Sequence, residues 1–159
     1  MADPPVVLLG VTGGIAAYKS AELLRLLQKA GMEVRVIMTR AGTHFVTPLT
    51  FETLSGHPVR LDETNELRAD SRITHIEDSR EADIMVIAPA TANTLAKMAN
   101  GIADNLLTSI CLAFTKTIVV APAMNTAMWE HPATQRNVLF LRERGVFVVE
   151  PGQGELACG

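Results

Sequence analysis

Short, continuous apolar runs recur along this chain, and each is followed by small or polar residues and then by a helical pattern. A strand that is apolar throughout is typical of a parallel sheet with both faces buried. Strands that alternate with helices at these lengths predict a doubly wound α/β layer, which binds ligands outside the carboxyl ends of its strands. The expected strands are Val6–Val11, Glu33–Thr39, Ile84–Ala88, a run that begins at Val119, and Val146–Val149.

Composition limits the chain to one domain and excludes several functional classes. The chain has 159 residues, of which 48% are hydrophobic, so one domain over residues 1–159 has an ample core. The net charge is −3 and the basic residues are scattered, so we expect no nucleic-acid partner. No apolar stretch approaches the ~18 residues of a membrane helix, and no basic leader opens the chain, so we expect a cytoplasmic protein. Cys111 and Cys158 are too few and too ill-spaced for a disulfide framework or a metal site.

A glycine turn, Thr12-Gly13-Gly14, links the first strand to a helix expected over residues 15–30. Glycines at this place let the backbone approach a phosphate, and the helix N-terminus supplies free N–H groups. The spacing is not that of the dinucleotide motif G-x-G-x-x-G, and no acidic residue ends the second strand, where Thr39 and Arg40 stand instead. The turn therefore predicts either a mononucleotide phosphate site or a simple tight turn.

A second candidate site follows the run that begins at residue 119. Pro122 has no N–H with which to continue a strand ladder, so Asn125 is presented at the edge of the sheet. Its amide offers two donors and an acceptor, which suit a planar carboxylate or the edge of a heterocycle. Met124, Met128 and Trp129 would form an apolar wall around it. The alternative is a capping asparagine beside core methionines.

Other candidate side chains are less specific. Thr91 and Asn93 follow the third strand and can either bind a ligand or cap the next helix. His75 has apolar neighbours, which is more typical of a structural histidine, although an imidazole can transfer protons near neutral pH. Residues 57–73 are charged and show no period, which indicates a solvated loop or a substrate-covering flap. Cys111 is expected to be a core thiol.

Three motifs together resemble the flavin-dependent cysteine decarboxylases over nearly the whole chain. Residues 122–129 read P-A-M-N-T-A-M-W and resemble the family's P-x-M-N-x-x-M-W signature, and residues 89–94 resemble its P-A-S-A-N-T motif, with Thr91 in place of serine. Residues 154–159 resemble its G-x-L-A-C-G substrate clamp. Within the family, the resemblance is greatest to phosphopantothenoylcysteine decarboxylases, which form one half of a bifunctional coenzyme A biosynthesis protein.

The resemblance implies a Rossmann-like (flavodoxin-like), single three-layer domain and FMN as cofactor. In the family, flavin oxidises the substrate thiol to a thioaldehyde, carbon dioxide is lost, and the reduced flavin returns its electrons. By this resemblance His75 is the base, Asn125 holds the carboxylate, Met128 and Ala157 contact the substrate, and Cys158 is the acid. The residues implied to contact FMN are Gly13, Gly14, Ile15, Thr39, Phe45, Ala90, Thr91, Asn93, Ser109, Ala123 and Met124.

The resemblance also implies partners and leaves rival functions open. Family members are homo-oligomers, as trimers or assemblies of trimers, and the bifunctional ones continue into a ligase domain, so we expect a domain trimmed from a longer protein. The rivals are a decarboxylase of peptide C-terminal cysteines and a non-catalytic, flavin-binding regulatory subunit. A flavin prenyltransferase shares the scaffold but should lack both the Met-Asn motif and the clamp cysteine.

Overall fold

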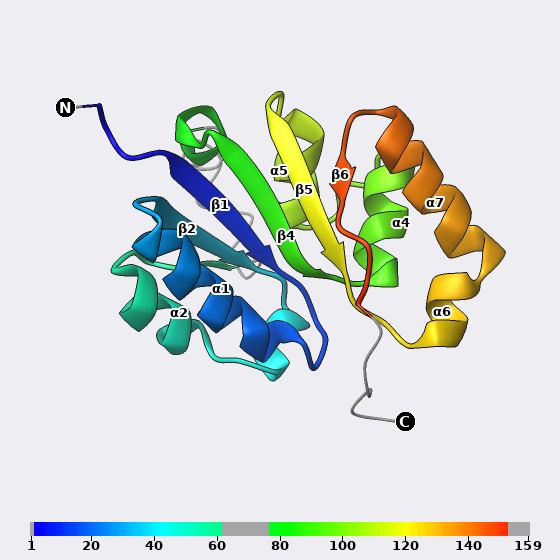
Figure 1. The fold of residues 1–159 in the computed structure, drawn as a ribbon, viewed down its shortest axis with the longest axis horizontal. Coiled ribbons are helices and arrows are strands. Elements are labelled where there is room, and N and C mark those ends of the chain that lie inside the picture. The colour runs from blue at the N-terminus through cyan, green and yellow to red at the C-terminus, as the bar shows by residue number, and fades with distance from the viewer. Residues whose placement is uncertain (1, 62–76, 153–159) are drawn as a thin grey trace.

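In the computed structural model, which describes residues 2–61 and 77–152, a parallel six-stranded sheet lies between two layers of helices (Figure 1). The strand order is β3-β2-β1-β4-β5-β6, so the order reverses between β1 and β4. This arrangement confirms the predicted doubly wound α/β fold. The strands are β1 (Val6–Val11), β2 (Glu33–Met38), β3 (Arg60–Leu61), β4 (Ile84–Ala90), β5 (Thr117–Pro122) and β6 (Phe147–Val148).

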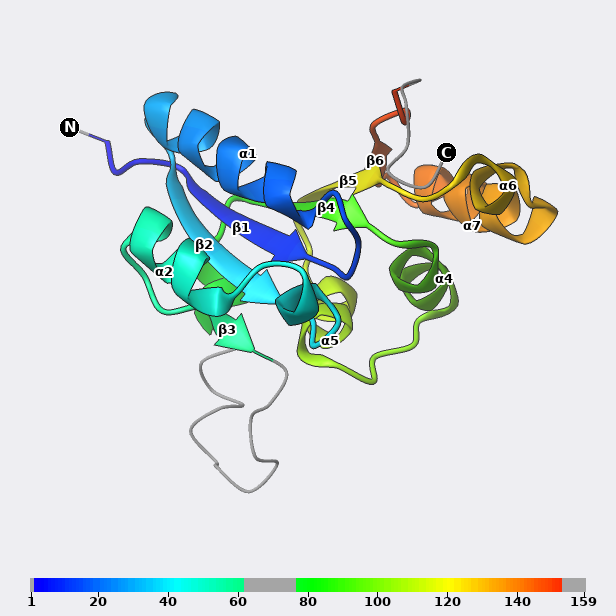
Figure 2. The same ribbon diagram turned by 90° about the horizontal axis from the view of Figure 1, so that it is seen from below.

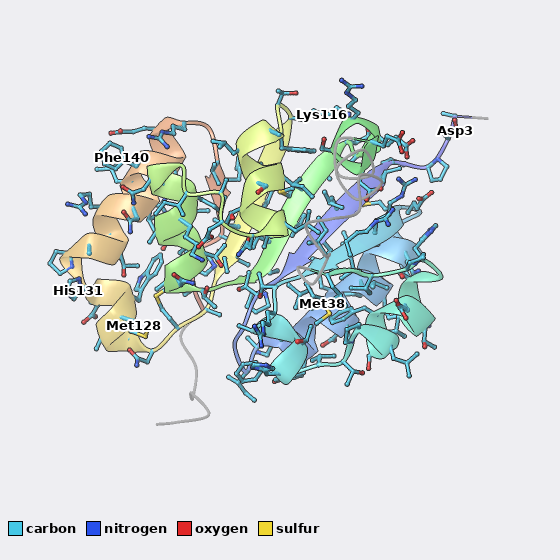
Figure 3. All side chains as sticks on the ribbon, turned by 180° about the vertical axis from the view of Figure 1, so that it is seen from behind. Asp3, Met38, Lys116, Met128, His131 and Phe140 are labelled. Atoms are coloured by element: carbon cyan, nitrogen blue, oxygen red, sulfur yellow. The ribbon has the colours of Figure 1, made fainter. Side chains whose placement is uncertain are left out.

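Helices cover the two faces of the sheet unequally. One face carries α1 and α2, and the other carries α4, α5 and α7 (Figures 2 and 3). The short helix α6 follows β5 at the carboxyl edge (Figure 1). The bounds are α1 (Ala17–Lys29), η1 (Gly42–His44), α2 (Pro48–Ser55), α4 (Ala92–Asn100), α5 (Leu106–Ala113), α6 (Thr126–Glu130) and α7 (Pro132–Glu143), and residues 77–81 are also helical.

Two apolar clusters, one on each face, hold the layers together. Leu24 of α1 and Phe51 of α2 are fully buried on one face, and Leu107 of α5 is buried on the other. The adjacent β1 residues Leu8 and Leu9 point into opposite clusters, which explains why this strand is apolar throughout. Each such side chain contributes about 1.5–3 kcal/mol when it is fully buried.

The predicted element bounds hold best where the sequence is most uniform. β1 has the predicted bounds, Val6–Val11. The helix expected from Ile15 begins two residues later, at Ala17, after a turn. The strand expected to end at Ala88 continues to Ala90, which pairs with β5.

One expectation about residues 57–73 was wrong. The pair Arg60–Leu61 forms β3, which pairs with β2, so the strand expected at 146–149 is the sixth and not the fifth. A strand of two residues is too short to show a period in the sequence. The remainder of the expected loop or flap, residues 62–73, lies outside the described residues. Within the described ranges, none of the helices has the length and apolar character needed to cross a bilayer.

Candidate ligand site at the carboxyl edge of the sheet

The carboxyl ends of β1 and β4 lie side by side where the strand order reverses, which is where open α/β sheets bind ligands. The buried hydroxyl of Thr12 joins them: Oγ1 donates to the carbonyl oxygen of Pro89 at 2.5 Å and accepts from the N–H of Thr91 at 3.1 Å. Ser20 of α1 donates to the carbonyl oxygen of Ala88 at 2.6 Å. Sequence reasoning assigned no role to Thr12 or Ser20. A lone hydroxyl directly after a buried strand is the signal that could have identified Thr12.

Two glycines let neighbouring turns approach closely at this edge. A Cβ on Gly13 would lie 2.4 Å from the Cβ of Ala41, and one on Gly42 would lie 2.6 Å from the carbonyl oxygen of Val11. Real Cβ atoms do not approach so closely, so both positions need glycine for the turns to pack. A Cβ on Gly14, in contrast, would meet nothing within 4 Å. Gly14 therefore borders open space in which a ligand can lie.

The start of α1 differs from the starts of the other helices at this edge. The side chains of Thr91, Asn105 and Asn125 cap α4, α5 and α6 by accepting backbone N–H bonds. The N-cap of α1 is Ala16, and no side chain caps this helix. The N–H groups of Ala17 and Lys19 donate to the carbonyl oxygens of Gly14 and Ala16. The positive end of the helix dipole nevertheless lies next to Gly14, an arrangement that suits a phosphate.

Residues predicted to contact the flavin in the turns after β1 and β2 fall into two groups. Thr39 is buried, and its Oγ1 accepts from the N–H of Gly42 at 3.1 Å, so its hydroxyl supports the turn. Ile15 and Phe45 are large apolar side chains that are more than half exposed. Open apolar groups beside a polar turn suit contact with an aromatic ring or with another subunit.

Capping explains part of the segment after β4. Thr91 Oγ1 accepts from the N–H of Thr94 at 3.2 Å, as expected of a helix cap. Asn93 is exposed, and its amide has no hydrogen-bond partner within the described residues. Ser109 of α5 donates to the carbonyl oxygen of Asn105 at 2.7 Å and is also exposed. Asn93 therefore has the most freely available polar side chain in this group.

Asn125 combines the two roles that its sequence context left open. Its Oδ1 accepts from the N–H of Met128 at 2.8 Å and so caps α6. The cap uses the amide oxygen, which leaves the exposed Nδ2 group to donate to a ligand. The N–H of Ala123 donates to the carbonyl oxygen of Ala90 at 3.1 Å, which ties this loop to the end of β4. Asn125 thus projects from a loop joined to the β1–β4 edge.

The three side chains of the apolar wall predicted around Asn125 differ in their burial. Met124 and Trp129 pack against the core cluster beneath α4 and α7. Met128 remains on the surface of α6, where it is 46% exposed (Figure 3). Trp129 is half-buried and lies one helical turn after Asn125. Met128 is therefore the apolar side chain that this loop offers to a ligand.

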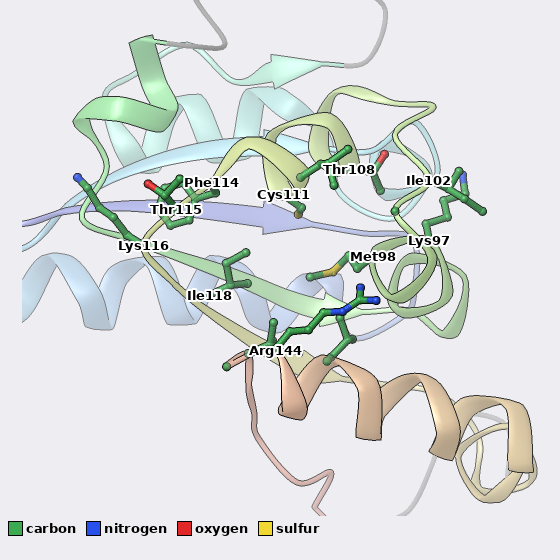
Figure 4. A pocket seen from close by; sticks show the side chains of 15 residues that line it. Lys97, Met98, Ile102, Thr108, Cys111, Phe114, Thr115, Lys116, Ile118 and Arg144 are labelled. Carbon is green, nitrogen blue, oxygen red and sulfur yellow. The ribbon is translucent and has the colours of Figure 1, made fainter.

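A separate groove of about 270 Å³ lies among α4, α5 and α7, on one face of the sheet (Figure 4). Its cations already have partners: Lys97 pairs with Asp104 at 2.9 Å, and Arg144 Nη1 donates to the carbonyl oxygen of Ala99 at 2.9 Å. The residues gathered at the carboxyl edge do not line this groove, apart from Thr108 near the start of α5. The groove is therefore distinct from the site at that edge.

Cys111 packs against the core cluster, as expected of a core thiol, and it also lines the groove. Its Sγ lies 3.6 Å from the Sδ of the buried Met85. Burial of the sulfur raises the pKa of Cys111 to about 12, which keeps the thiol protonated and unreactive near neutral pH. His75, Ala157 and Cys158, which were predicted to act on the substrate, lie outside the described residues.

Comparison with known proteins shows the family to which this chain belongs. A sequence profile named Flavoprotein matches residues 1–159. The chain belongs to the Flavoprotein family. It is 49% identical over 153 residues to the coenzyme A biosynthesis bifunctional protein CoaBC of Bacillus subtilis (strain 168), and 44% identical to that of Escherichia coli (strain K12). Each match covers 96% of this chain and 37% of the relative, so the chain spans a little over a third of these flavoproteins.

Solved flavoprotein structures share the whole fold. The FMN-dependent cysteine decarboxylase SpaF is 39% identical, with a TM-score of 0.86 that covers 96% of this chain and 87% of SpaF. A Cys-to-Ser mutant of PPC decarboxylase, complexed with pantothenoylaminoethenethiol, is 39% identical, with a TM-score of 0.85 over 98% of this chain and 87% of that one. The FMN binding protein AtHal3 is 40% identical, with a TM-score of 0.81 over 98% and 85%.

Proposed function

We propose that this chain is an FMN-dependent decarboxylase that converts phosphopantothenoylcysteine to phosphopantetheine in coenzyme A biosynthesis. The observation that carries the proposal is the exposed Asn125, whose Nδ2 group is free to donate. The loop that carries Asn125 is tied to the β4 edge, beside the glycine turn and the uncapped start of α1. A carboxylate-binding group and a phosphate-binding turn are thus held on one edge of one sheet.

The residues at this edge fit FMN. The open space at Gly14 and the positive end of the α1 dipole would hold its phosphate, and Asn93 offers a polar side chain to the ring system. Ile15 and Phe45 supply exposed apolar surface for the ring. When bound, FMN would accept two electrons in turning the cysteine thiol into a thioaldehyde and would later return them.

The side chains of this chain would then bind the substrate and move protons. Asn125 Nδ2 donates to the substrate carboxylate and holds it in place until it leaves as carbon dioxide. His75 accepts the proton released when the thiol is oxidised. The electron pair of the breaking carbon–carbon bond passes to the thioaldehyde, and the product is an aminoenethiol. Cys158 donates the proton that, together with the two electrons returned by the cofactor, saturates the carbon–carbon double bond of the aminoenethiol. The thiol of Cys111, whose pKa is raised by burial, does not share this role.

The curated relatives favour phosphopantothenoylcysteine over its nearest rival substrate, a peptide C-terminal cysteine. CoaBC relatives reach 49% identity, whereas the peptidyl-cysteine decarboxylase EpiD is 27% identical, with a TM-score of 0.82. The relative complexed with pantothenoylaminoethenethiol is a Cys-to-Ser mutant, which supports a late role for a cysteine such as Cys158. We further infer that the active protein is a homo-oligomer and that this domain is joined to a ligase domain, as the bifunctional relatives suggest.

The division of labour between His75 and Cys158 is the test of this function. Under anaerobic conditions, His75→Asn should prevent reduction of the flavin by phosphopantothenoylcysteine, because oxidation lacks its base. Cys158→Ala should still oxidise and decarboxylate the substrate but should stop at the oxidised aminoenethiol. Each defect should reach about 10²–10⁴-fold, as for other positioned acids and bases. Flavin absorbance and product mass measure the two steps.

Cys111→Ala is the matched control, because it removes a thiol from the groove and should leave both steps close to the parent rate. If Cys158→Ala produces fully reduced phosphopantetheine at the parent rate, then Cys158 is not the catalytic acid. A parent protein that takes up no flavin, or that decarboxylates a peptide C-terminal cysteine in preference, would contradict the proposed function itself.

A further inference from the structure

The groove among α4, α5 and α7 combines a buried apolar floor with a positively charged rim. Ile118 of β5 and Phe114, at the end of α5, are buried at its floor. Among the residues that the structure describes, the charged ones that line the groove are all cations: Lys97, Lys116 and Arg144. An apolar cavity with a few polar groups is the usual form of a small-molecule site. The charge of the rim therefore indicates an anionic ligand.

Arg144 is the cation of the rim whose charge is least neutralised. Lys97 pairs with Asp104 at 2.9 Å, and Lys116 lies 3.9 Å from Asp83. In the described part of the chain, Arg144 has no acidic partner, and its Nη1 donates to a neutral carbonyl oxygen of α4. A guanidinium carries five N–H donors in a planar fork, so donors remain for a carboxylate, which this fork binds through both oxygens.

The guanidinium of Arg144 is held in place beside the groove. Its bond to the carbonyl oxygen of Ala99 is 2.9 Å long, and the centre of the Phe140 ring lies 5.8 Å from its Cζ. Figure 4 shows the side chain extending from the end of α7 toward Met98. Because the binding group is already ordered, a ligand loses less affinity to side-chain ordering.

The size of the groove and the helix ends around it restrict the ligand further. Its volume of about 270 Å³ lies just below the range of about 300–1,000 Å³ for drug-sized ligands, so a small molecule fits. Gly101 and Gly145, which follow α4 and α7, line the groove. The carboxyl ends of helices carry partial negative charge, which favours a ligand with one negative charge over a phosphate with two. Ile102 and Leu112, which are 48% and 65% exposed, add apolar surface to the lining.

We propose that this groove binds a small amphipathic monocarboxylate, whose carboxylate pairs with Arg144 and whose hydrocarbon tail lies along Met98 and Ile118. The carboxylate supplies the acidic partner that Arg144 lacks among the described residues. The tail covers the apolar lining and removes its surface from water. The groove is distinct from the carboxyl edge of the sheet, so this inference does not depend on the proposed decarboxylation.

The experiment titrates the full chain with octanoate and measures the heat of binding. Octylamine and 1-octanol share the tail of octanoate and test the head group, whereas acetate shares the head group and tests the tail. We expect each of these three compounds to bind at least about tenfold more weakly than octanoate. The first two lack the charged hydrogen bonds to Arg144, and acetate lacks the apolar contact.

Two variants test whether the ligand lies in the groove. Arg144→Gln removes the charge, so it should weaken octanoate binding at least about tenfold and leave 1-octanol binding unchanged. Leu112→Glu adds a carboxylate at an exposed position of the lining, so it should weaken octanoate binding and strengthen octylamine binding. Arg142→Gln is the matched control, because Arg142 pairs with Glu150 and does not line the groove, and it should keep the parent affinity.

Circular dichroism shows whether each variant is folded. If Arg144→Gln does not fold, Leu112→Glu decides the question, because the Leu112 side chain is exposed. The proposed site is overturned if the parent does not bind octanoate, if it binds octylamine equally well, or if both variants keep the parent affinity for octanoate. Absence of octanoate binding, together with loss of self-association in Leu112→Glu, would assign the groove to a contact between copies of the chain instead.

Discussion

At the scale of single residues, the Thr12 hydroxyl is the link on which the carboxyl edge most depends. It is 1% exposed and satisfies both a carbonyl oxygen of β4 and the N–H of Thr91. Thr12→Val keeps the shape but leaves both groups unpaired, so we expect the free energy of unfolding in urea to fall by about 1–3 kcal/mol. Thr12→Ser retains the hydroxyl and should lose less than half as much. Equal stability of the valine variant and the parent would show that these bonds contribute nothing net.

At the scale of elements, the two glycines of the turn before α1 have different roles. Gly13→Ala would press against Ala41, so we expect it to lower stability by about 1–3 kcal/mol even without FMN. Gly14→Ala meets open space, so stability without FMN should stay within about 0.5 kcal/mol of the parent. Its FMN affinity should nevertheless fall at least about tenfold, because the new methyl group occupies the phosphate's place. FMN affinity is measured by fluorescence titration. An unchanged affinity in Gly14→Ala would show that the phosphate does not bind at this turn.

At the scale of the whole molecule, exposed apolar side chains on α1, α2 and the turns before them predict self-association. Ile15, Tyr18, Phe45 and Leu49 are each 51–68% exposed. We expect sedimentation to show trimers or assemblies of trimers, and we expect Phe45→Lys to dissociate them and to release FMN. Leu26→Lys, at a similarly exposed position farther along α1, is the matched control and should remain assembled. A parent monomer that still binds FMN tightly would contradict this prediction.

The sequence predicted best those features that depend on near neighbours. The apolar run Val6–Val11 has its predicted bounds because every residue in it faces one of the two cores. Gly56 ends α2 with a φ of 77°, a conformation that favours glycine. The Met-Asn loop was also located correctly, and the capping bond of Asn125 was one of the two roles that its sequence left open. The packing of Trp129 against the core depends on how α6 lies on the fold.

By itself, the sequence determined the α/β class, the strands other than β3, and the motifs that place the chain among the flavoproteins, because those signals lie within a few residues of one another. Only the tertiary structure decided which polar groups meet. Thr12 and Pro89 are 77 residues apart, and Arg35 and Asp78 are 43 apart. Such pairs form because parallel strands bring distant segments into one layer, and no local pattern records which side chains will then face each other.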